Sequence, residues 1–254
     1  MTVSDPAGQS PVVIITGAAQ RIGARTARHF HDQGFRVIIH YRRSLQAANS
    51  LRDEFNRVRP ESAVTLQADL DDFEQVTKLA EQALAAFGRL DVLVNNASSF
   101  FPTPLGTITT QQWHQLMGSN ACAPLFLSQA LAPALTETRG CIVNLADMNA
   151  ERGMAGFTPY TMAKAALLAM TQSLARELAP AVRVNSVSPG AILWPEHASD
   201  ADEDAEKRQQ ILAGIPAGRL GTEDDIAATV FFLATQGHYI TGENIRVDGG
   251  RALA

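Results

Sequence analysis

Tyr160 and Lys164 stand four residues apart, and Asp147 lies thirteen residues before the tyrosine. Side chains at that spacing share one face of a helix, so the lysine ammonium can sit beside the phenol. A neighbouring positive charge favours the phenolate, which predicts that Lys164 lowers the pKa of Tyr160 toward the range of a general acid or base. A surface pair of polar helix residues is the alternative, and the other motifs of the chain argue against it.

A small-residue turn at 16–23 (TGAAQRIG) follows the apolar run Val12 to Ile15 and leads into a helical pattern. Glycines let the backbone approach a ligand closely, and the start of a helix offers unpaired amides and the positive end of the helix dipole. These features predict a pyrophosphate-binding turn. Because the spacing differs from G-x-G-x-x-G, a tight strand-to-helix turn without a ligand is the alternative.

The second expected strand ends in His40-Tyr41-Arg42-Arg43-Ser44, which contains no carboxylate. An acidic residue at this place binds the adenosine ribose of NAD, whereas an arginine accommodates the additional phosphate of NADP. Two guanidinium groups and a hydroxyl suit a phosphate dianion through charge-assisted hydrogen bonds. The motif therefore predicts NADP(H) rather than NAD(H), with a solvated basic loop as the alternative.

Polar residues also follow the third and fourth expected strands: Asp69 after the third, and Asn95-Asn96-Ala97 after the fourth. Ligands of open α/β sheets bind at the carboxyl ends of the strands, where these residues lie. We expect Asp69 to accept a hydrogen bond from the adenine amino group. We expect Asn95 to contact the adenosine ribose and brace the neighbouring loops, although asparagine is also common in turns for structural reasons.

The elements that position these residues are short β-branched runs that alternate with longer helical patterns. This alternation predicts a parallel sheet with helices on both faces, and strands buried on both sides lack a polar–apolar alternation, as here. We expect an α/β fold with a single Rossmann-type, doubly wound parallel sheet of about seven strands. The expected strands are Val12 to Ile15, Val37 to Ile39, Val64 to Leu66, Val92 to Val94, Ile142 to Leu145, Val182 to Val187 and Ile245 to Val247.

Two helices can be bounded from the sequence. The segment 71–74 (DDFE) places acidic residues in a first turn, and Gly88, just beyond Phe87, marks the end of that helix. A further helix is expected from about Pro159 to Leu178. Tyr160 and Lys164 then lie in its opening turns, close to the carboxyl end of the preceding strand.

The length of 254 residues suits one domain over 1–254, without metals or disulfides as staples. No apolar run approaches the roughly 20 residues of a membrane span, and 1–11 is expected to be a flexible leader and not a signal peptide. Cys122 and Cys141 form no C-x-x-C pair, which argues against a metal site and favours a reducing cytoplasm. The net charge of −5 gives no general attraction to nucleic acid.

Taken in order, the motifs resemble those of the short-chain dehydrogenase/reductase family from about Val12 to Gly250. They are Thr16-Gly17-x-x-x-Arg21-x-Gly23, Asn95-Asn96-Ala97, Asn120, Tyr160-x-x-x-Lys164 and Pro189-Gly190. The resemblance implies a single Rossmann domain, hydride transfer from a nicotinamide and commonly a homotetramer.

Several details are similar to the pteridine reductases within that family. Arg21 stands where most members have glycine, and Asp147 stands where most have the catalytic serine. His40-Tyr41-x-Arg43-Ser44 resembles their NADPH motif, and the segment 96–105 (NASSFFPTPL) resembles their substrate loop. The segments 239–242 (YITG) and 247–250 (VDGG) resemble their C-terminal part.

The resemblance also implies how a substrate is held. Phe100 is expected to stack on one face of a pterin while the nicotinamide covers the other. Ser98 and Arg21 are expected to hydrogen-bond the polar edge of the pterin and the cofactor phosphates. For the neighbouring Phe101, core packing is the preferred interpretation.

The catalytic roles implied by the resemblance involve four residues. Asp147 supports Tyr160 as the proton donor, Lys164 lowers the tyrosine pKa and grips the ribose, and Asn120 helps to order a water path. Asp147 and Tyr160 also face the substrate. The residues expected to bind the cofactor are Gly17, Arg21, Ile22, His40, Tyr41, Arg42, Arg43, Ser44, Asp69, Leu70, Asn95, Ala97, Ser98, Lys164, Pro189 and Gly190.

These features predict an NADPH-dependent pteridine reductase that acts on dihydrobiopterin, dihydromonapterin or dihydrofolate, with the preferred substrate left open. A carbonyl or 3-oxoacyl reductase of the same family and a catalytically weak NADP(H)-binding regulatory protein are the alternatives. The segment 191–214 is expected to form a substrate lid, in which Trp194, Pro195 and His197 could contact substrate. The acidic run from Asp200 to Glu206 is expected to be a solvated segment, with a gating role as the alternative.

Overall fold

A computed structural model of the chain describes residues 10–192 and 209–253. One sheet of parallel strands runs through it in the order β3-β2-β1-β4-β5-β6-β7. The strands are β1 (Val12–Ile15), β2 (Arg36–Tyr41), β3 (Ala63–Gln67), β4 (Val92–Asn95), β5 (Cys141–Leu145), β6 (Arg183–Pro189) and β7 (Asn244–Val247). The predicted α/β fold with a seven-stranded, doubly wound sheet is therefore confirmed. Most of the expected leader and lid, including Trp194, Pro195, His197 and the acidic run, lies outside the described residues.

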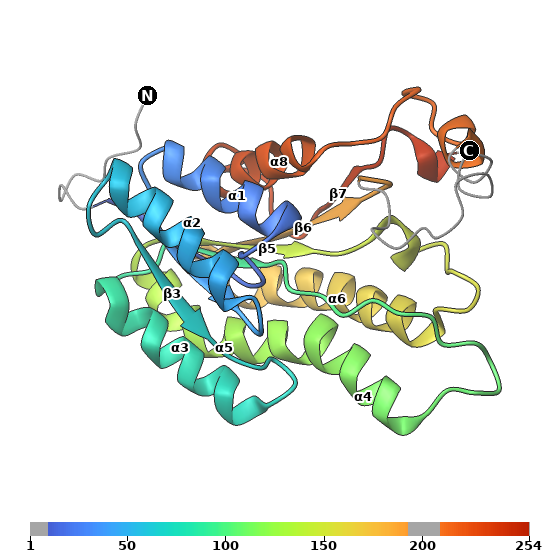
Figure 1. Cartoon of the computed structure of the whole chain (residues 1–254), viewed down its shortest axis with the longest axis horizontal. Helices are drawn as coiled ribbons and strands as arrows, with labels where there is room; N and C mark the ends of the chain where they lie inside the picture. The colour runs from blue at the N-terminus through green and yellow to red at the C-terminus, as the bar shows by residue number, and fades with distance from the viewer. Residues whose placement is uncertain (1–9, 193–208, 254) are drawn as a thin grey trace.

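Helices cover both faces of the sheet (Figure 1). On one face lie α1 (Arg21–Asp32), α2 (Leu45–Val58) and α8 (Glu223–Thr235), and on the other lie α3 (Phe73–Phe87), α5 (Ala123–Glu137) and α6 (Thr158–Glu177). The π-helical turn η1 (Gly118–Cys122) joins α4 (Thr110–Met117) to α5, and η2 (Met148–Ala150) and η3 (Arg251–Leu253) are short 3-10 turns. Over the described ranges, no helix is long and apolar enough to cross a membrane.

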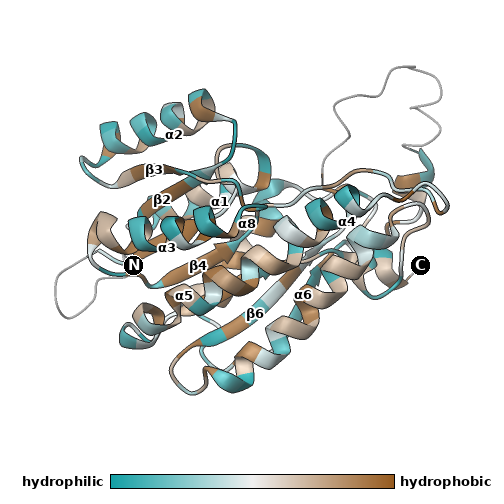
Figure 2. Cartoon of the chain, turned by 90° about the horizontal axis from the view of Figure 1, so that it is seen from below, coloured by the Kyte–Doolittle hydropathy of each residue, from teal (hydrophilic) through white to brown (hydrophobic). Residues whose placement is uncertain are grey.

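The core forms because successive residues of each central strand point to opposite faces, and both faces are apolar. In β1, Val13 and Ile15 pack into the cluster beneath α1 and α8, while Val12 and Ile14 pack into the cluster beneath α3 and α5. All four are completely buried, and burial of one such side chain contributes about 2 kcal/mol. Figure 2 shows the strands β2, β3 and β4 in the colour of hydrophobic residues between helices with polar outer faces.

Two helices begin and end where local chemistry predicts. The Asp72 carboxylate accepts hydrogen bonds from the N–H groups of Glu74 and Gln75 before α3, and Gly88, at φ 70°, follows its last residue. Helix α6 buries Tyr160 and Lys164 on one face, as the four-residue spacing predicts.

The order of the strands decides where a ligand can bind. Strand β1 lies between β2 and β4, so the chain leaves β1 in one direction across the sheet and returns to its other side at β4. The loops that follow β1, β2, β4 and β5 all leave the carboxyl edge of the sheet, where this reversal opens a crevice. The turn at 16–20 and the residues after β2, β4 and β5 are thereby brought together.

Candidate active site

A cavity of about 770 Å³ opens at this edge of the sheet. Its wall contains every site residue predicted from the sequence except Asn95 and Asn120. Those predicted residues are Gly17, Arg21, Ile22, His40, Tyr41, Arg42, Arg43, Ser44, Asp69, Leu70, Ala97, Ser98, Phe100, Asp147, Tyr160, Lys164, Pro189 and Gly190. Phe101 is half-buried and lies outside the wall, as expected for a packing residue.

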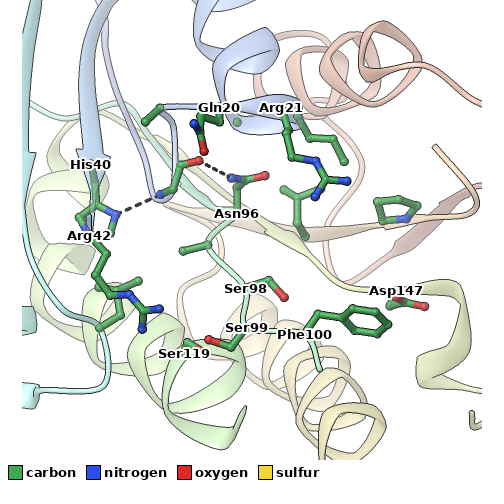
Figure 3. Close-up of a pocket in the computed structure, with 18 of the residues that line it drawn as sticks. Gln20, Arg21, His40, Arg42, Asn96, Ser98, Ser99, Phe100, Ser119 and Asp147 are labelled. Atoms are coloured by element: carbon green, nitrogen blue, oxygen red, sulfur yellow. Dashed lines mark hydrogen bonds between the residues drawn. The ribbon is translucent and has the colours of Figure 1, made fainter. Parts of the chain in front are cut away.

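The turn between β1 and α1 is shaped by two glycines and one asparagine. Gly17 has φ 62°, a left-handed conformation that favours glycine. A Cβ atom at Gly23 would overlap the Gly17 carbonyl oxygen and lie 2.6 Å from Asn96 Nδ2. The Asn96 amide donates to Thr16 O at 2.8 Å and to Gly17 O at 3.2 Å. Figure 3 shows Asn96 pointing toward the turn, with the second of these bonds as a dashed line. The turn keeps this shape only because Gly17 and Gly23 have no side chain.

The first turn of α1 is open to an anion. Its N-cap, Gln20, makes no side-chain cap hydrogen bond, and the first turn holds no acidic residue. By contrast, Asp72, Thr109 and Thr222 cap α3, α4 and α8 with their own side chains. Uncapped amides beside a glycine turn suit the pyrophosphate of a dinucleotide, so the residues present fit a nicotinamide dinucleotide cofactor.

Arg21, the first residue of α1, has the uncommon φ of 52° for a residue with a side chain. Its side chain is exposed and projects from the turn over the cavity (Figure 3). Backbone strain of this kind persists where the surrounding structure holds it, and it often marks a functional site.

His40 supports the turn from below and is not free to bind an anion. Its Nδ1 accepts the Gly17 N–H at 3.0 Å, and its Nε2 contacts Ala68 O at 3.2 Å, so the ring is the neutral Nε2–H tautomer. Burial lowers the His40 pKa to about 4, against opposing effects of the Ala68 hydrogen bond and Asp69. Both ring nitrogens are occupied by backbone groups, so the imidazole positions the turn. Because His40 also lines the cavity, its predicted contact with the cofactor stays a prediction.

The two arginines after β2 have different surroundings. Arg42 Nη1 lies 3.7 Å from Asp69 Oδ1 and 3.4 Å from Asp71 Oδ2. The Arg43 side chain is exposed, and among the described residues no hydrogen bond or ion pair engages its guanidinium group. The hydroxyl of Ser44 lies 3.5 Å from Gln20 Oε1, at the edge of the turn.

Asn95 lies behind the wall of the cavity. Strand β4 extends one residue further than predicted, so Asn95 belongs to the sheet and not to the loop that follows. Its Nδ2 donates to Asn144 Oδ1 at 2.8 Å, while its own Oδ1 is buried without a partner among the described residues. The predicted contact with the ribose and the bracing of the loops are therefore misassigned to Asn95, because Asn96 makes the bracing bonds.

Asn120 is also behind the wall, in η1, and is completely buried. Its Oδ1 accepts from Ser98 Oγ at 2.7 Å, and its Nδ2 donates to Ser99 O and Leu116 O, both at 2.9 Å. With its amide fully engaged, the side chain holds the loop after β4 in place. This arrangement gives the Asn120 side chain a positioning role. Its predicted part in ordering a water path stays a prediction.

The proton-transfer groups meet at the other end of the cavity. The Tyr160 hydroxyl donates to Asp147 Oδ2 at 2.7 Å. The other carboxylate oxygen of Asp147 accepts from Asn149 twice, from its backbone N–H at 2.7 Å and from its Nδ2 at 2.9 Å. Because one residue fixes Oδ1 with two donors, Oδ2 is held toward the tyrosine.

The predicted lowering of the Tyr160 pKa is wrong for this structure. Burial raises that pKa, and the charge of Asp147 and its hydrogen bond raise it further, while a hydrogen bond with Ser98 acts in the opposite direction. Lys164 Nζ lies 5.9 Å from the centre of the Tyr160 ring and donates to Leu145 O at 2.7 Å. The nearest charge to the phenol is thus a carboxylate, which favours the protonated phenol.

Lys164 is itself almost completely buried. Burial lowers its pKa to about 8, and the charge of Asp147 opposes this effect. The lysine therefore stays mainly protonated at neutral pH and places a positive charge inside the cavity wall.

An aromatic group faces the proton-transfer residues. The Phe100 ring stacks on Phe157 at 4.7 Å and 9°, and meets the Tyr160 ring edge-on at 4.8 Å and 77°. Despite these contacts Phe100 is 56% exposed, and Figure 3 shows it pointing along the cavity beside Asp147. The backbone N–H of Thr103 donates to Gly156 O at 2.6 Å, which fastens the loop after β4 to the loop before α6.

Several residues of the site were missed by the sequence reasoning. Gln20, Ser99 and Ser119 line the cavity, Asn149 orients Asp147, and Phe157 supports Phe100. Gln20 lies inside the predicted turn, so its position alone could have identified it. Ser99 lies inside the predicted substrate loop 96–105, so its position could have identified it too. Ser119, Asn149 and Phe157 belong to none of the predicted motifs, and only their spatial neighbours reveal them.

Comparison with known proteins gives similarity along nearly the whole chain. Residues 17–252 match a protein-family model described as enoyl-(acyl carrier protein) reductase. Pteridine reductase 1 of Leishmania tarentolae is 36% identical, with 100% of this chain and 99% of the relative aligned. The 3-oxoacyl-[acyl-carrier-protein] reductase of Staphylococcus aureus is 34% identical over 93% of this chain and 96% of its own. L-Rhamnose 1-dehydrogenase (NAD(P)(+)) of Azotobacter vinelandii is 37% identical over 94% of this chain and 95% of its own.

Proposed function

The chain belongs to the short-chain dehydrogenase/reductase family, and we propose that within it the protein is an NADPH-dependent pteridine reductase. The family membership makes it an oxidoreductase that uses a nicotinamide cofactor. The finer proposal is that it converts a dihydropterin, namely dihydrobiopterin, dihydromonapterin or dihydrofolate, to the tetrahydro form. Relatives with other substrates have similar identities, so the proposal depends on the site and not on identity alone.

The observation that carries the proposal is the 2.7 Å hydrogen bond from Tyr160 to the Asp147 carboxylate. Most members of the family have a serine at the position of Asp147, which offers a carbonyl oxygen a second hydroxyl donor beside the tyrosine, and this chain has no hydroxyl there. A pterin instead has ring nitrogens that must gain a proton when hydride arrives at carbon. A carboxylate in contact with a phenol can pass that proton on.

The residues that would hold the cofactor occupy one wall of the cavity. The turn at Gly17 and the first amides of α1 suit its pyrophosphate, and Arg43 with Ser44 suits the additional phosphate of NADP. Lys164 has the charge and position to hold the nicotinamide ribose. When bound, the cofactor supplies the hydride.

The protein's own contribution is to hold the substrate and manage its proton. Phe100, supported by Phe157, offers a flat apolar face on which a pterin ring can stack. Tyr160 stays protonated because burial and Asp147 raise its pKa, and its hydroxyl is the proposed proton donor to the substrate. Asp147, held by Asn149, then receives a proton from solvent and returns it to the phenolate.

The test is NADPH oxidation with 7,8-dihydrobiopterin and 7,8-dihydrofolate, comparing the wild type with Tyr160→Phe and Asp147→Ser. We expect turnover by the wild type and a loss of about 100-fold or more in each variant, the scale of general acid catalysis. Tyr239→Phe is the matched control, because Tyr239 is fully exposed and outside the cavity wall. Absence of pterin turnover despite NADPH binding would refute the proposal.

A second test concerns the stacking face. Phe100→Ala should raise KM for the pterin by about 10-fold, through lost stacking and apolar burial, and leave NADPH binding unchanged. Phe232→Ala is the control, since Phe232 is similarly exposed at 42% but belongs to α8 and lies outside the cavity wall. An equal KM for the pterin in the wild type and in Phe100→Ala would show that the pterin ring does not stack on Phe100.

The competing function is a carbonyl or 3-oxoacyl reductase, which the 34% identical relative of that name favours. A panel of ketones and 3-oxoacyl thioesters in the same assay separates the two. Turnover on that panel with none on pterins would reverse the assignment.

The oligomeric state proposed with this function is a homotetramer. Phe73 and Phe126 are both more than two-fifths exposed and their rings meet at 5.1 Å, which supports burial of this surface by another copy. Light scattering that gives the mass of a monomer under assay conditions would refute it.

A further inference from the structure

The arginine that first suggests a phosphate site is already paired. Arg42 lies within ion-pair distance of two carboxylates, Asp69 and Asp71, and no described carboxylate approaches Arg43. Figure 3 shows the Arg42 side chain running along the cavity wall toward Ser119. The two neighbouring guanidinium groups thus differ in how much positive charge they can offer to a ligand.

Asp71 is held in place by more than Arg42. Its carboxylate accepts the backbone N–H of Ser119 in η1, and its own backbone N–H donates to Asp69 Oδ1 at 3.2 Å. Gly118 leaves space for it, because a Cβ there would lie 2.8 Å from Asp71 Oδ1. The carboxylate is therefore built into the junction between the loop after β3 and η1, and is not a mobile surface charge.

The negative charges of Asp69 and Asp71 face the single positive charge of Arg42. Burial raises the pKa of Asp71, the neighbouring Asp69 raises it further, and Arg42 opposes both effects. Two carboxylates this close need a shared counter-ion. Arg42 supplies it, so a phosphate that recruits Arg42 must compete with both carboxylates.

We propose that Asp71 determines cofactor selectivity by retaining Arg42, so that Arg43 and Ser44 are the primary groups for the 2′-phosphate of NADPH. The preference for NADPH over NADH is then smaller than two free arginines would give. This inference rests on the NADP(H) part of the proposed function and is independent of the pterin.

The test measures dissociation constants of NADPH and NADH by fluorescence titration of the full-length protein without substrate. Asp71→Asn keeps an oxygen to accept the Ser119 N–H but removes the charge. It should raise the ratio of the NADH to the NADPH dissociation constant by about fivefold, near the upper end for a partly exposed ion pair. When Arg42 is already replaced by alanine, Asp71→Asn should change this ratio by less than about twofold, because Asp71 acts on the ratio through the Arg42 guanidinium. A ratio that is unchanged or falls in Asp71→Asn overturns the inference.

A second comparison leaves Asp71 in place. Arg43→Ala should weaken NADPH binding by about tenfold or more, and Arg42→Ala by about threefold or less. Equal losses in the two variants overturn the inference. Asp53→Asn is the control, because Asp53 pairs with Arg52 on α2 in a similar exposed ion pair outside the cavity wall, and both dissociation constants should stay unchanged.

The results also separate this inference from the proposed function. If NADH binds more tightly than NADPH, or if neither binds, both the cofactor assignment and the role of Asp71 fail. If NADPH is preferred but Asp71→Asn does not alter the ratio, the inference alone fails. Because no pterin is used, the absence of pterin turnover affects only the proposed function.

Discussion

Acidification should destabilise the protein through His40 and loosen the dinucleotide turn in the same pH range. His40 is 1% exposed and accepts the Gly17 N–H with an unprotonated Nδ1. A proton on Nδ1 would face that N–H, so the turn would lose its support from β2. The perturbation we choose is His40→Asn, because the Asn side-chain oxygen can still accept from Gly17 but does not titrate between pH 4 and 7.

The size of the effect follows from two pKa values of His40: the ordinary histidine value of 6.5, which applies to the unfolded chain, and about 4 in the folded protein. The folded pKa is the lower one, so the unfolded chain binds the proton first. The associated stability is complete above pH 6.5 and is lost as the pH falls through 4. The pKa difference corresponds to about 3 kcal/mol of the free energy of unfolding, of which about 2 kcal/mol is lost between pH 7 and pH 5.

The assay is urea unfolding at fixed protein concentration, at several pH values from 7 to 5, for the wild type and His40→Asn. The variant should be less stable at pH 7 by about 1–2 kcal/mol, because its contact with Ala68 is lost. Its further loss down to pH 5 should be smaller than that of the wild type by about 2 kcal/mol. His29 and His31, whose pKa values are also lowered by burial, titrate in both proteins and cancel in the difference. Parallel pH profiles would refute the reasoning.

Further changes test other parts of the site. Gly23→Ala should abolish dinucleotide binding, because the added Cβ has no space in the turn after β1. Gly214→Ala is the control and should bind the dinucleotide normally, since the nearest atom to its Cβ would be 3.6 Å away. Dinucleotide binding by the Gly23 variant would contradict the role of this turn. Asn149→Ala should lower kcat by about tenfold and leave the NADPH dissociation constant unchanged, because Asp147 loses one of its two orienting donors. Asn149→Ser should restore part of the lost kcat. An unaltered kcat in Asn149→Ala would show that the backbone N–H alone orients Asp147. Turnover and NADPH affinity should fall as the pH rises through about 8, because Lys164 then loses its charge, and a flat profile up to pH 10 would contradict this pKa.

The fold and the outline of the site could be predicted because their signals are local. Apolar runs buried on both faces predict strands, and Asp72 and Gly88 satisfy or end a helix through bonds to nearby backbone. The four-residue spacing of Tyr160 and Lys164 fixes their common helix face. The glycine turn follows from the space that a backbone needs around a ligand.

The errors arose where a residue's role depends on which way it faces. Asn95 and Asn96 are adjacent, but the last residue of β4 points into the layer beneath the sheet, whereas the next one faces the turn after β1. Because β4 is one residue longer than predicted, the role of bracing the turn belongs to Asn96 and not to Asn95. Asn120 was placed near the site correctly, but its amide is taken up by Ser98, Ser99 and Leu116 and does not line the cavity.

The sequence by itself determined the sheet, the glycine turn and the candidate side chains of the site, because each follows from neighbours within a few residues. Only the tertiary structure decided the charge and orientation of those side chains. Burial and a carboxylate from the loop after β5 set the Tyr160 pKa, and two carboxylates from the loop after β3 occupy Arg42. Electrostatic interactions and desolvation act through space, between elements that are far apart in the chain and meet only when it folds.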